Sequence, residues 1–219
     1  MYQSRYRPAT SYAPRVSNAA LLGQVLGITG AGFLVTALAA YLFRDISQGA
    51  ALLAFIAGFV LLISMQVVRN NERLALLLFY AFTFLEGIGL APTIARYVAL
   101  APDVVVNAAG TTGAGMLVLG GVAYIGSVDW RRFSGIGTVL LVALLIVGVI
   151  SMFVRFLHPG TYAWLTLGVF TLWTLIDFSR IRAGGDGATP VQLAVSIYLD
   201  GINIFLALLR IFGLRSGRD

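Results

Sequence analysis

The chain lacks cysteine and lysine, and it has a single histidine, His158. Without cysteine, disulfides and thiolate metal sites are excluded. One histidine, in a predicted loop, excludes multi-histidine metal sites and most nucleophile–base pairs. We therefore expect no catalytic residues and no tightly bound cofactor.

Charge is also scarce: only 11% of the 219 residues are charged, whereas 59% are hydrophobic. The mean hydropathy of +0.90 is too high for a soluble domain of this size. Basic residues are all arginine and lie mostly at the ends of apolar segments, so they indicate membrane orientation rather than nucleic-acid binding. The composition indicates an integral membrane protein in contact with the lipid bilayer.

The apolar segments predict an all-α, polytopic protein with seven transmembrane helices. A spanning helix needs roughly 20 apolar residues, and the segments with short connections predict a compact antiparallel bundle. We expect a polar N-terminal tail over 1–17, a transmembrane domain over 18–213 and a C-terminal tail over 214–219. The expected helices are 18–43, 48–68, 74–99, 104–126, 134–157, 161–182 and 190–213.

Arginine positions predict the orientation. Seven arginines fall before the first expected helix or after the second and fourth, and two more end the sixth. These nine arginines place the N-terminus in the cytoplasm. The apolar run after the tail is long for a signal peptide and predicts a retained first span. Arg210, Arg215 and Arg218 would lie outside if the last helix spans fully, and inside if it is broken or re-entrant.

Three acidic residues lie within apolar segments: Glu86, Asp177 and Asp200. An ionised side chain at bilayer depth costs about 2.5 kcal/mol or more. Such residues therefore usually face a cavity, pair with another polar group or have a functional role. Asp177 and Asp200 are nearly equidistant from the turn AGGDGATP, so they are expected to meet across a helical hairpin. Two close carboxylates in a low dielectric tend to share one proton, which predicts a proton-sensitive latch.

The last expected helix carries a polar stripe of Gln192, Ser196, Asp200 and Asn203. These residues share one helical face, which should point to the bundle interior. The pattern predicts that this helix is central in the bundle. Ser196 and Asn203, together with Glu86, are candidate ion-path residues, although Asp200 could also be a neutral acid bonded to Ser196 or Asn203.

The counter-charge of Asp177 has two interpretations. Arg69, at the cytoplasmic end of the second helix, is the predicted partner in a latch. Alternatively, Asp177 pairs with Arg180 or Arg182 at its own helix end, where pairs three to four residues apart are common.

Glycines suggest close helix packing in two places. Gly23 and Gly27 have helical spacing in the first expected helix, and Gly87 and Gly89 follow Glu86 in FLEGIGLAP. Pro92 in the same stretch predicts a kink. The kink with a nearby carboxylate could contribute to an ion path or serve packing alone.

FLEGIGLAP and SIYLDGINIFLALLRIFG resemble the two signature regions of the transmembrane Bax inhibitor motif family, and most closely its bacterial calcium-leak members. The similarity extends over nearly the whole chain. It implies a seven-helix fold with a central last helix and a pH-dependent calcium leak gated by an aspartate pair. Asp177 and Asp200 match that pair, and Arg69 matches the basic latch, although RNNER is less basic than the bacterial pattern.

The leading hypothesis is a proton-sensitive calcium leak channel in a bacterial inner membrane, with the pH sensor formed by Asp177, Asp200 and Arg69. Carboxylate oxygens suit calcium, and Asp177, Asp200 and Glu86 would form only a weak, transient site, as conduction requires. We expect a monomer.

Three alternatives remain. One is a non-conducting regulator that binds a membrane protease or another partner through the N-terminal tail. The others are a proton-coupled exchanger and an intramembrane aspartyl protease. The protease is disfavoured because its typical motifs are absent around Asp177 and in AGGD.

Overall fold

The computed structural model describes residues 17–68, 71–154 and 157–216. The N-terminal segment 2–15, considered above as a partner contact, lies outside the described residues. The described part contains helices and no strands, in agreement with the expected all-α class. The long helices are α1 (Asn18–Leu42), α2 (Gln48–Val67), α3 (Glu72–Leu100), α4 (Pro102–Ile125), α5 (Ser134–Phe153), α6 (Pro159–Arg182) and α7 (Pro190–Ser216), and two short 3₁₀ turns are η1 (Trp130–Phe133) and η2 (Gly185–Gly187).

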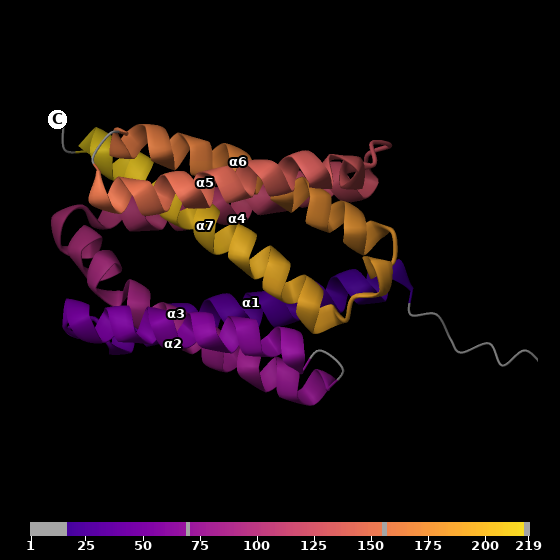
Figure 1. Cartoon of the computed structure of the whole chain (residues 1–219), viewed down its shortest axis with the longest axis horizontal. Coiled ribbons are helices and arrows are strands. Elements are labelled where there is room, and N and C mark those ends of the chain that lie inside the picture. Colours follow the sequence, from indigo (N-terminus) through magenta and orange to yellow (C-terminus); the bar gives the residue numbers. More distant parts are fainter. Residues whose placement is uncertain (1–16, 69–70, 155–156, 217–219) are drawn as a thin grey trace, which may run out of the picture.

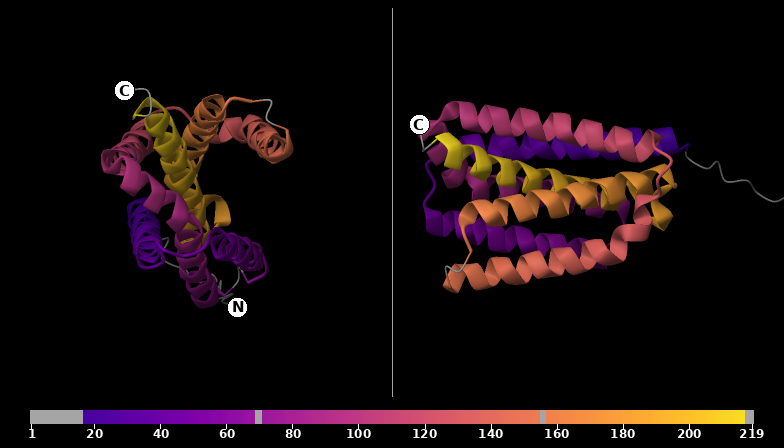
Figure 2. Two further views of the ribbon diagram at one scale, coloured as in Figure 1. Left: turned by 90° about the vertical axis from the view of Figure 1, so that its left-hand side faces the viewer. Right: turned by 90° about the horizontal axis from the view of Figure 1, so that it is seen from above.

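The helices form two layers joined by α7. Figure 1 shows α1, α2 and α3 on one side and α4, α5 and α6 on the other. The last helix, α7, crosses between them and packs against α1, α3, α4 and α6. Figure 2 shows the same arrangement from two further directions. Residues of α7 therefore contribute to three of the hydrophobic clusters that hold the layers together.

Helix ends follow local capping chemistry. The side chains of Ser17, Ser47 and Asn71 accept hydrogen bonds from backbone amides in the first turns of α1, α2 and α3. Prolines begin α4, α6 and α7, where a missing amide hydrogen is tolerated. Most predicted ends are within three residues of those observed. The exception is α5, which ends at Phe153 rather than 157.

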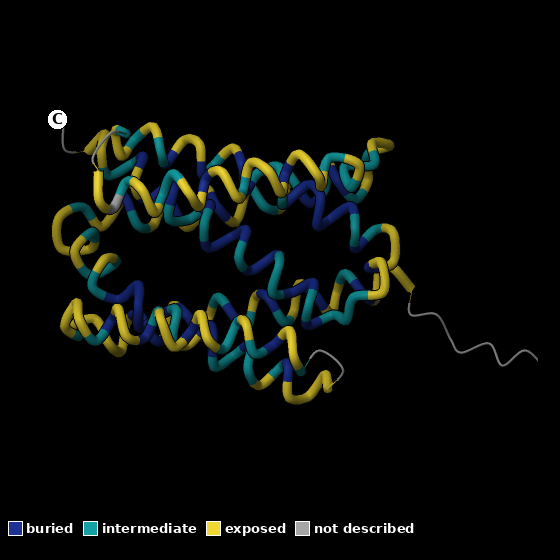
Figure 3. Tube along the Cα trace, in the orientation of Figure 1, coloured by how far each residue is buried: buried dark blue, intermediate teal, exposed yellow. Residues whose placement is uncertain are grey.

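The outer faces of the bundle are apolar. Six helices in the described residues, all the long ones except α6, have the length and apolar composition to cross a membrane. Large hydrophobic side chains such as Leu34, Ile125 and Phe153 are more than two-thirds exposed, and Figure 3 shows that exposed residues cover the outside while buried ones gather toward α7. An exposed apolar surface of this extent marks contact with lipid. The remaining long helix, α6, packs against α4, α5 and α7. It carries the charged residues Asp177, Arg180 and Arg182.

Close helix packing was predicted at two pairs of glycines, and the structure confirms it at one of them. A Cβ at Gly87 would meet the Thr36 carbonyl oxygen and Ala39, and one at Gly89 would lie 2.8 Å from the Phe55 ring. Close approach of α1 and α2 to α3 therefore requires these glycines. The prediction for Gly23 and Gly27 is wrong: nothing lies within 4 Å of a Cβ at either position. Gly23 and Gly27 have helical spacing and still meet no neighbouring helix, whereas Gly87 and Gly89, only two residues apart, both do.

The last helix is continuous from Pro190 to Ser216. It ends at the opposite end of the bundle from the start of α1, as Figure 2 shows. The structure therefore lacks a broken or re-entrant α7, and Arg210 and Arg215 lie toward the end remote from the start of α1.

Pro92, which the sequence predicted to kink its helix, lies inside α3 and does not end that helix. Beyond the middle of the helix, α3 turns toward the α4 layer (Figure 1).

Candidate functional site

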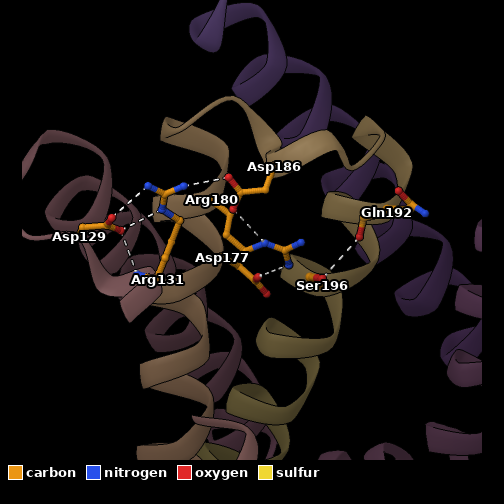
Figure 4. A network of polar contacts seen from close by, with 7 residues as sticks. All are labelled: Asp129, Arg131, Asp177, Arg180, Asp186, Gln192 and Ser196. Carbon is orange, nitrogen blue, oxygen red and sulfur yellow. Dashed lines mark hydrogen bonds and ion pairs between the residues drawn. The ribbon is translucent and has the colours of Figure 1, made fainter. Parts of the chain in front are cut away.

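Asp177 lies near the end of α6 and is 3% exposed. Arg180, three residues later, donates a hydrogen bond from Nη1 to Asp177 Oδ1 at 3.1 Å. Figure 4 shows this ion pair beside the turn that joins α6 to α7. A spacing of three residues places both side chains on one helical face. Asp177 is thus a buried carboxylate with a cation on one of its oxygens.

Asp200 lies on α7 and is 4% exposed. It is close enough to Asp177, across the α6–α7 contact, for the two charges to interact. Its Oδ2 atom is buried and has no hydrogen-bond partner among the described residues. The Thr174 hydroxyl, which lies near Asp200, donates to the Phe170 carbonyl at 2.8 Å. An unpartnered buried oxygen is costly, which makes Asp200 a candidate site for a proton or a cation.

Asp177 and Asp200 lie on neighbouring helices, α6 and α7, as the hairpin spacing predicted. The turn between them explains this arrangement. Gly184, Gly185 and Gly187 have positive φ, and so does Asp186 (φ 50°). Aspartate tolerates this left-handed conformation better than most residues. The tight turn makes α6 and α7 antiparallel neighbours, and both carboxylates are buried.

A second carboxylate, Asp186, also lies near Arg180. The Arg180 Nε atom is 4.0 Å from Asp186 Oδ2, and Arg131 Nη1 is 2.8 Å from Asp186 Oδ1. Arg131 in turn binds Asp129 at 2.9 Å. This cluster, called here the turn network (Asp129, Arg131, Asp186 and Arg180), is drawn in Figure 4. It connects the α4–α5 connection to the buried Asp177.

The exposed end of the turn network has ordinary surface electrostatics. A side-chain hydrogen bond from Arg131 lowers the pKa of Asp129 below its usual value. Asp129 and Asp186 are both partly exposed, so water and salt screen these pairs. Arg180 is different because it is only 32% exposed and its partner Asp177 is almost fully buried.

The predicted latch residue Arg69 lies outside the described residues. The alternative, pairing of Asp177 at its own helix end, is what the structure shows, with Arg180 as the partner. Arg182 has another function: its guanidinium donates to the carbonyl oxygens of Gly126 and Val128. It thus ties the end of α6 to the α4–α5 connection.

The polar stripe of α7 binds its own backbone. Asn203 donates to the Leu199 carbonyl at 2.8 Å, and Ser196 donates to the Gln192 carbonyl at 3.5 Å. Neither bonds to Asp200 in the described residues, so the predicted hydrogen bond from Asp200 to Ser196 or Asn203 is not formed. Ser196 and Gln192 also line a cavity of about 370 Å³ together with Arg180 and Gln66. This cavity lies between α2, α3 and the start of α7, next to the Asp177–Arg180 pair, and the rest of its lining is apolar.

Glu86 lies apart from the aspartate pair. It is half-buried on α3 and close enough to Tyr198 for its charge to act on the phenol. The Tyr198 hydroxyl lies 2.7 Å from the Thr36 hydroxyl, between α7 and α1. Among the described residues, no group of three acidic or histidine side chains could hold a metal ion. The expected site of Asp177, Asp200 and Glu86 is therefore not formed in the described part of the chain.

The comparisons with known proteins agree with this architecture. The sequence model described as "Inhibitor of apoptosis-promoting Bax1" matches residues 18–217. The chain belongs to the Bax inhibitor family. A family member from Vibrio cholerae, an uncharacterized membrane protein, is 30% identical over 80% of this chain and 79% of its own length. An uncharacterized Helicobacter pylori protein is 30% identical over 75% and 72%, and the inner membrane protein YbhL of Escherichia coli is 26% identical over 92% and 94%.

In this Bax inhibitor family member, sequence reasoning found both aspartates but missed the turn network. The spacing of Asp177 and Arg180 was visible, yet Arg69 was equally well placed by sequence. Asp186 had one further signal, since it is an acid within a glycine-rich turn. That signal was interpreted as a helix stop only, and its pairing with Arg131, 55 residues earlier, depends on tertiary structure.

Chemically, the site combines one ion-paired carboxylate with one unpartnered carboxylate in an apolar environment. Such a site can exchange a proton between Asp177 and Asp200, and it can bind a hard cation weakly through carboxylate oxygens. Two carboxylates are too few for a tight calcium cage, which normally takes roughly six to eight oxygens.

Proposed function

We propose that this Bax inhibitor family member is a pH-sensitive calcium leak of a bacterial inner membrane. The membrane helices and the family support a membrane function, and the aspartate pair supplies the proton-sensitive element. We assign it no catalytic reaction. The observation that carries the proposal is the unpartnered Oδ2 of Asp200 beside the ion-paired Asp177.

The proposed gate uses Arg180 as the latch of Asp177. When Asp177 is ionised, Arg180 is held against it and stabilises the closed contact of α6 with α7. When Asp177 takes a proton, its attraction for Arg180 is largely lost. Arg180 can then turn to Asp186, whose carboxylate already lies 4.0 Å away. Protons and calcium compete for the same oxygens of the aspartate pair, so the leak is sensitive to pH.

Two structural elements complete the proposal. In this proposal α7 is the central helix: it carries Asp200, and its contacts with helices of both layers support that position. The 370 Å³ cavity, whose lining includes the polar side chains of Arg180, Gln66, Gln192 and Ser196, is the aqueous entrance on the side of the start of α1. That side faces the cytoplasm, because most arginines lie there.

Calcium flux in liposomes tests the proposal. Full-length protein is reconstituted with an entrapped calcium dye, and influx is followed over a pH series. The wild type should show a pH-dependent leak, and Asp200→Asn should lose the pH dependence because the pair can no longer share a proton. Asp103→Asn, a matched change at an exposed residue at the start of α4, should behave as wild type.

Two results would overturn the proposal. One is an Asp200→Asn protein whose flux follows pH as the wild type does. The other is a folded wild-type protein that gives no calcium flux at any pH, a result favouring the regulator alternative. Folding of each variant is checked by gel filtration and thermal unfolding in detergent.

A further inference from the structure

A second, larger cavity lies between the two layers. It has a volume of about 840 Å³, within the range of roughly 300–1,000 Å³ typical of ligand sites. Residues from α1, α3, α4 and α7 line it, and we call it the interlayer cavity. Representative lining residues are Phe33, Ala37, Tyr41, Ile94, Gly113 and Phe205.

The interlayer cavity has a closed inner end and an open outer end. At the inner end, Phe33 and Met116 pack on Gly201 so tightly that a Cβ at Gly201 would lie 2.5 Å from the Phe33 ring and 2.6 Å from Met116 Sδ. At the outer end, Tyr41 is 65% exposed and Arg44 belongs to the lining. The cavity thus opens on the lipid-facing side of the bundle near the end of α1.

The walls of the interlayer cavity are unsuited to water. Its lining is almost entirely apolar, and the two threonine hydroxyls in it are already occupied. Thr112 donates to the Ala108 carbonyl at 2.8 Å, and Thr36 bonds to the Thr83 carbonyl at 2.9 Å. A water molecule in the cavity would find few hydrogen-bond partners, whereas a hydrocarbon chain needs none.

The length of the cavity matches one leaflet of a bilayer. From Arg44 at the mouth to Phe33 at the inner end, α1 rises roughly 16 Å at 1.5 Å per residue. The hydrocarbon core of a bilayer is about 30 Å thick, so this depth is close to half of it. A chain that enters at the interface would therefore end near the middle of the membrane.

The mouth carries one charge of each sign. Arg44 Nε lies 3.5 Å from Asp45 Oδ2, and their side chains are 56% and 93% exposed. The Arg44 guanidinium also lies over the Tyr41 ring, 5.2 Å from its centroid. Arginine and tyrosine at this depth are typical of the membrane interface. A head group with a phosphate and an ammonium would meet an opposite charge at each position, whereas Asp45 would repel a purely anionic one.

We propose that the interlayer cavity binds an acyl chain of a phospholipid with a zwitterionic, amine-bearing head group. The chain lies between α1, α3, α4 and α7. The phosphate contacts Arg44 and the ammonium contacts Asp45. The inner end of the chain reaches Gly201, the neighbour of Asp200 on α7. This lipid site does not depend on calcium transport.

Native mass spectrometry of the full-length protein tests the site. The protein in detergent is titrated with phosphatidylethanolamine and phosphatidylglycerol of identical acyl chains. We expect phosphatidylethanolamine to bind more tightly by roughly two- to five-fold, the range of an exposed charge pair. Asp45→Asn should remove this preference, and Arg44→Gln should weaken binding of both lipids.

Glycine variants on α4 test the cavity itself. Gly113 lines the cavity and nothing lies within 4 Å of a Cβ placed on it. Gly113→Leu should fill the space and weaken lipid binding by roughly tenfold or more. Gly115 has the same open surroundings but lies outside the cavity lining, so Gly115→Leu is the matched control and should bind lipid as the wild type does.

Clear outcomes would contradict the inference. Equal binding of the two lipids by the wild type, or tighter binding of phosphatidylglycerol, overturns the head-group assignment. Unchanged lipid binding by a folded Gly113→Leu protein overturns the cavity site. If Gly113→Leu lowers calcium flux while lipid binding is unchanged, the cavity belongs to an ion path instead. Thermal unfolding in detergent confirms that each variant is folded.

Discussion

Arg180 donates a hydrogen bond to Asp177 at 3.1 Å while its Nε atom lies 4.0 Å from Asp186. One guanidinium is therefore placed between a buried carboxylate and a partly exposed one. A buried charge needs a partner far more than an exposed one does, so Arg180 stays with Asp177 as long as Asp177 is ionised. Because Asp177 and Asp186 compete for Arg180, mutation of each carboxylate separates its effect on Arg180 from that of the other.

Removing the positive charge of Arg180 should change the pH at which the gate responds. In Arg180→Gln, Asp177 loses its compensating charge and the protonated carboxyl is favoured. The midpoint of the flux–pH curve should therefore move to higher pH, by about one unit for roughly 1.4 kcal/mol of lost interaction. Liposome calcium flux measures it, with Arg210→Gln, an exposed position on α7, as the control. An unmoved midpoint in Arg180→Gln would show that Arg180 is not the latch.

Removing the competing carboxylate should have the opposite effect. In Asp186→Asn, Arg180 no longer has a second anion and remains with Asp177. The midpoint of the flux–pH curve should move to lower pH, by less than in Arg180→Gln because Asp186 is farther away and more exposed. The double variant Arg180→Gln/Asp186→Asn should behave as Arg180→Gln does. Additive shifts in the double variant would mean that Asp186 acts without Arg180.

Helix packing at Gly87 can be tested without any transport assay. A Cβ on Gly87 would collide with backbone atoms of Thr36 on α1, and backbone cannot move aside as a flexible side chain can. Gly87→Ala should lower the free energy of unfolding by about 1–3 kcal/mol, measured by thermal or denaturant unfolding in detergent. In contrast, Gly23→Ala should be neutral or stabilising by up to about 1 kcal/mol, because its surroundings are open and alanine favours helix. Equal effects of the two changes would contradict the observed α1–α3 packing.

The sequence by itself determined the class of protein, the number of long helices and most helix ends. Hydrophobic length sets membrane spans, and serine, asparagine and proline set helix starts through local hydrogen bonds, so these features need no tertiary information. The same holds for the placement of Asp177 and Asp200 on two neighbouring antiparallel helices, because a short turn joins those helices.

Only the tertiary structure decided which groups meet across longer separations in the chain. It paired Asp186 with Arg131, 55 residues earlier, and it placed Glu86 outside any group with the aspartates that could hold a metal ion among the described residues. It also separated Gly87, which packs closely, from Gly23, which does not. Helical periodicity defines faces but not their neighbours. The neighbour of each face depends on the rotation and crossing of helices, which all their side chains determine together.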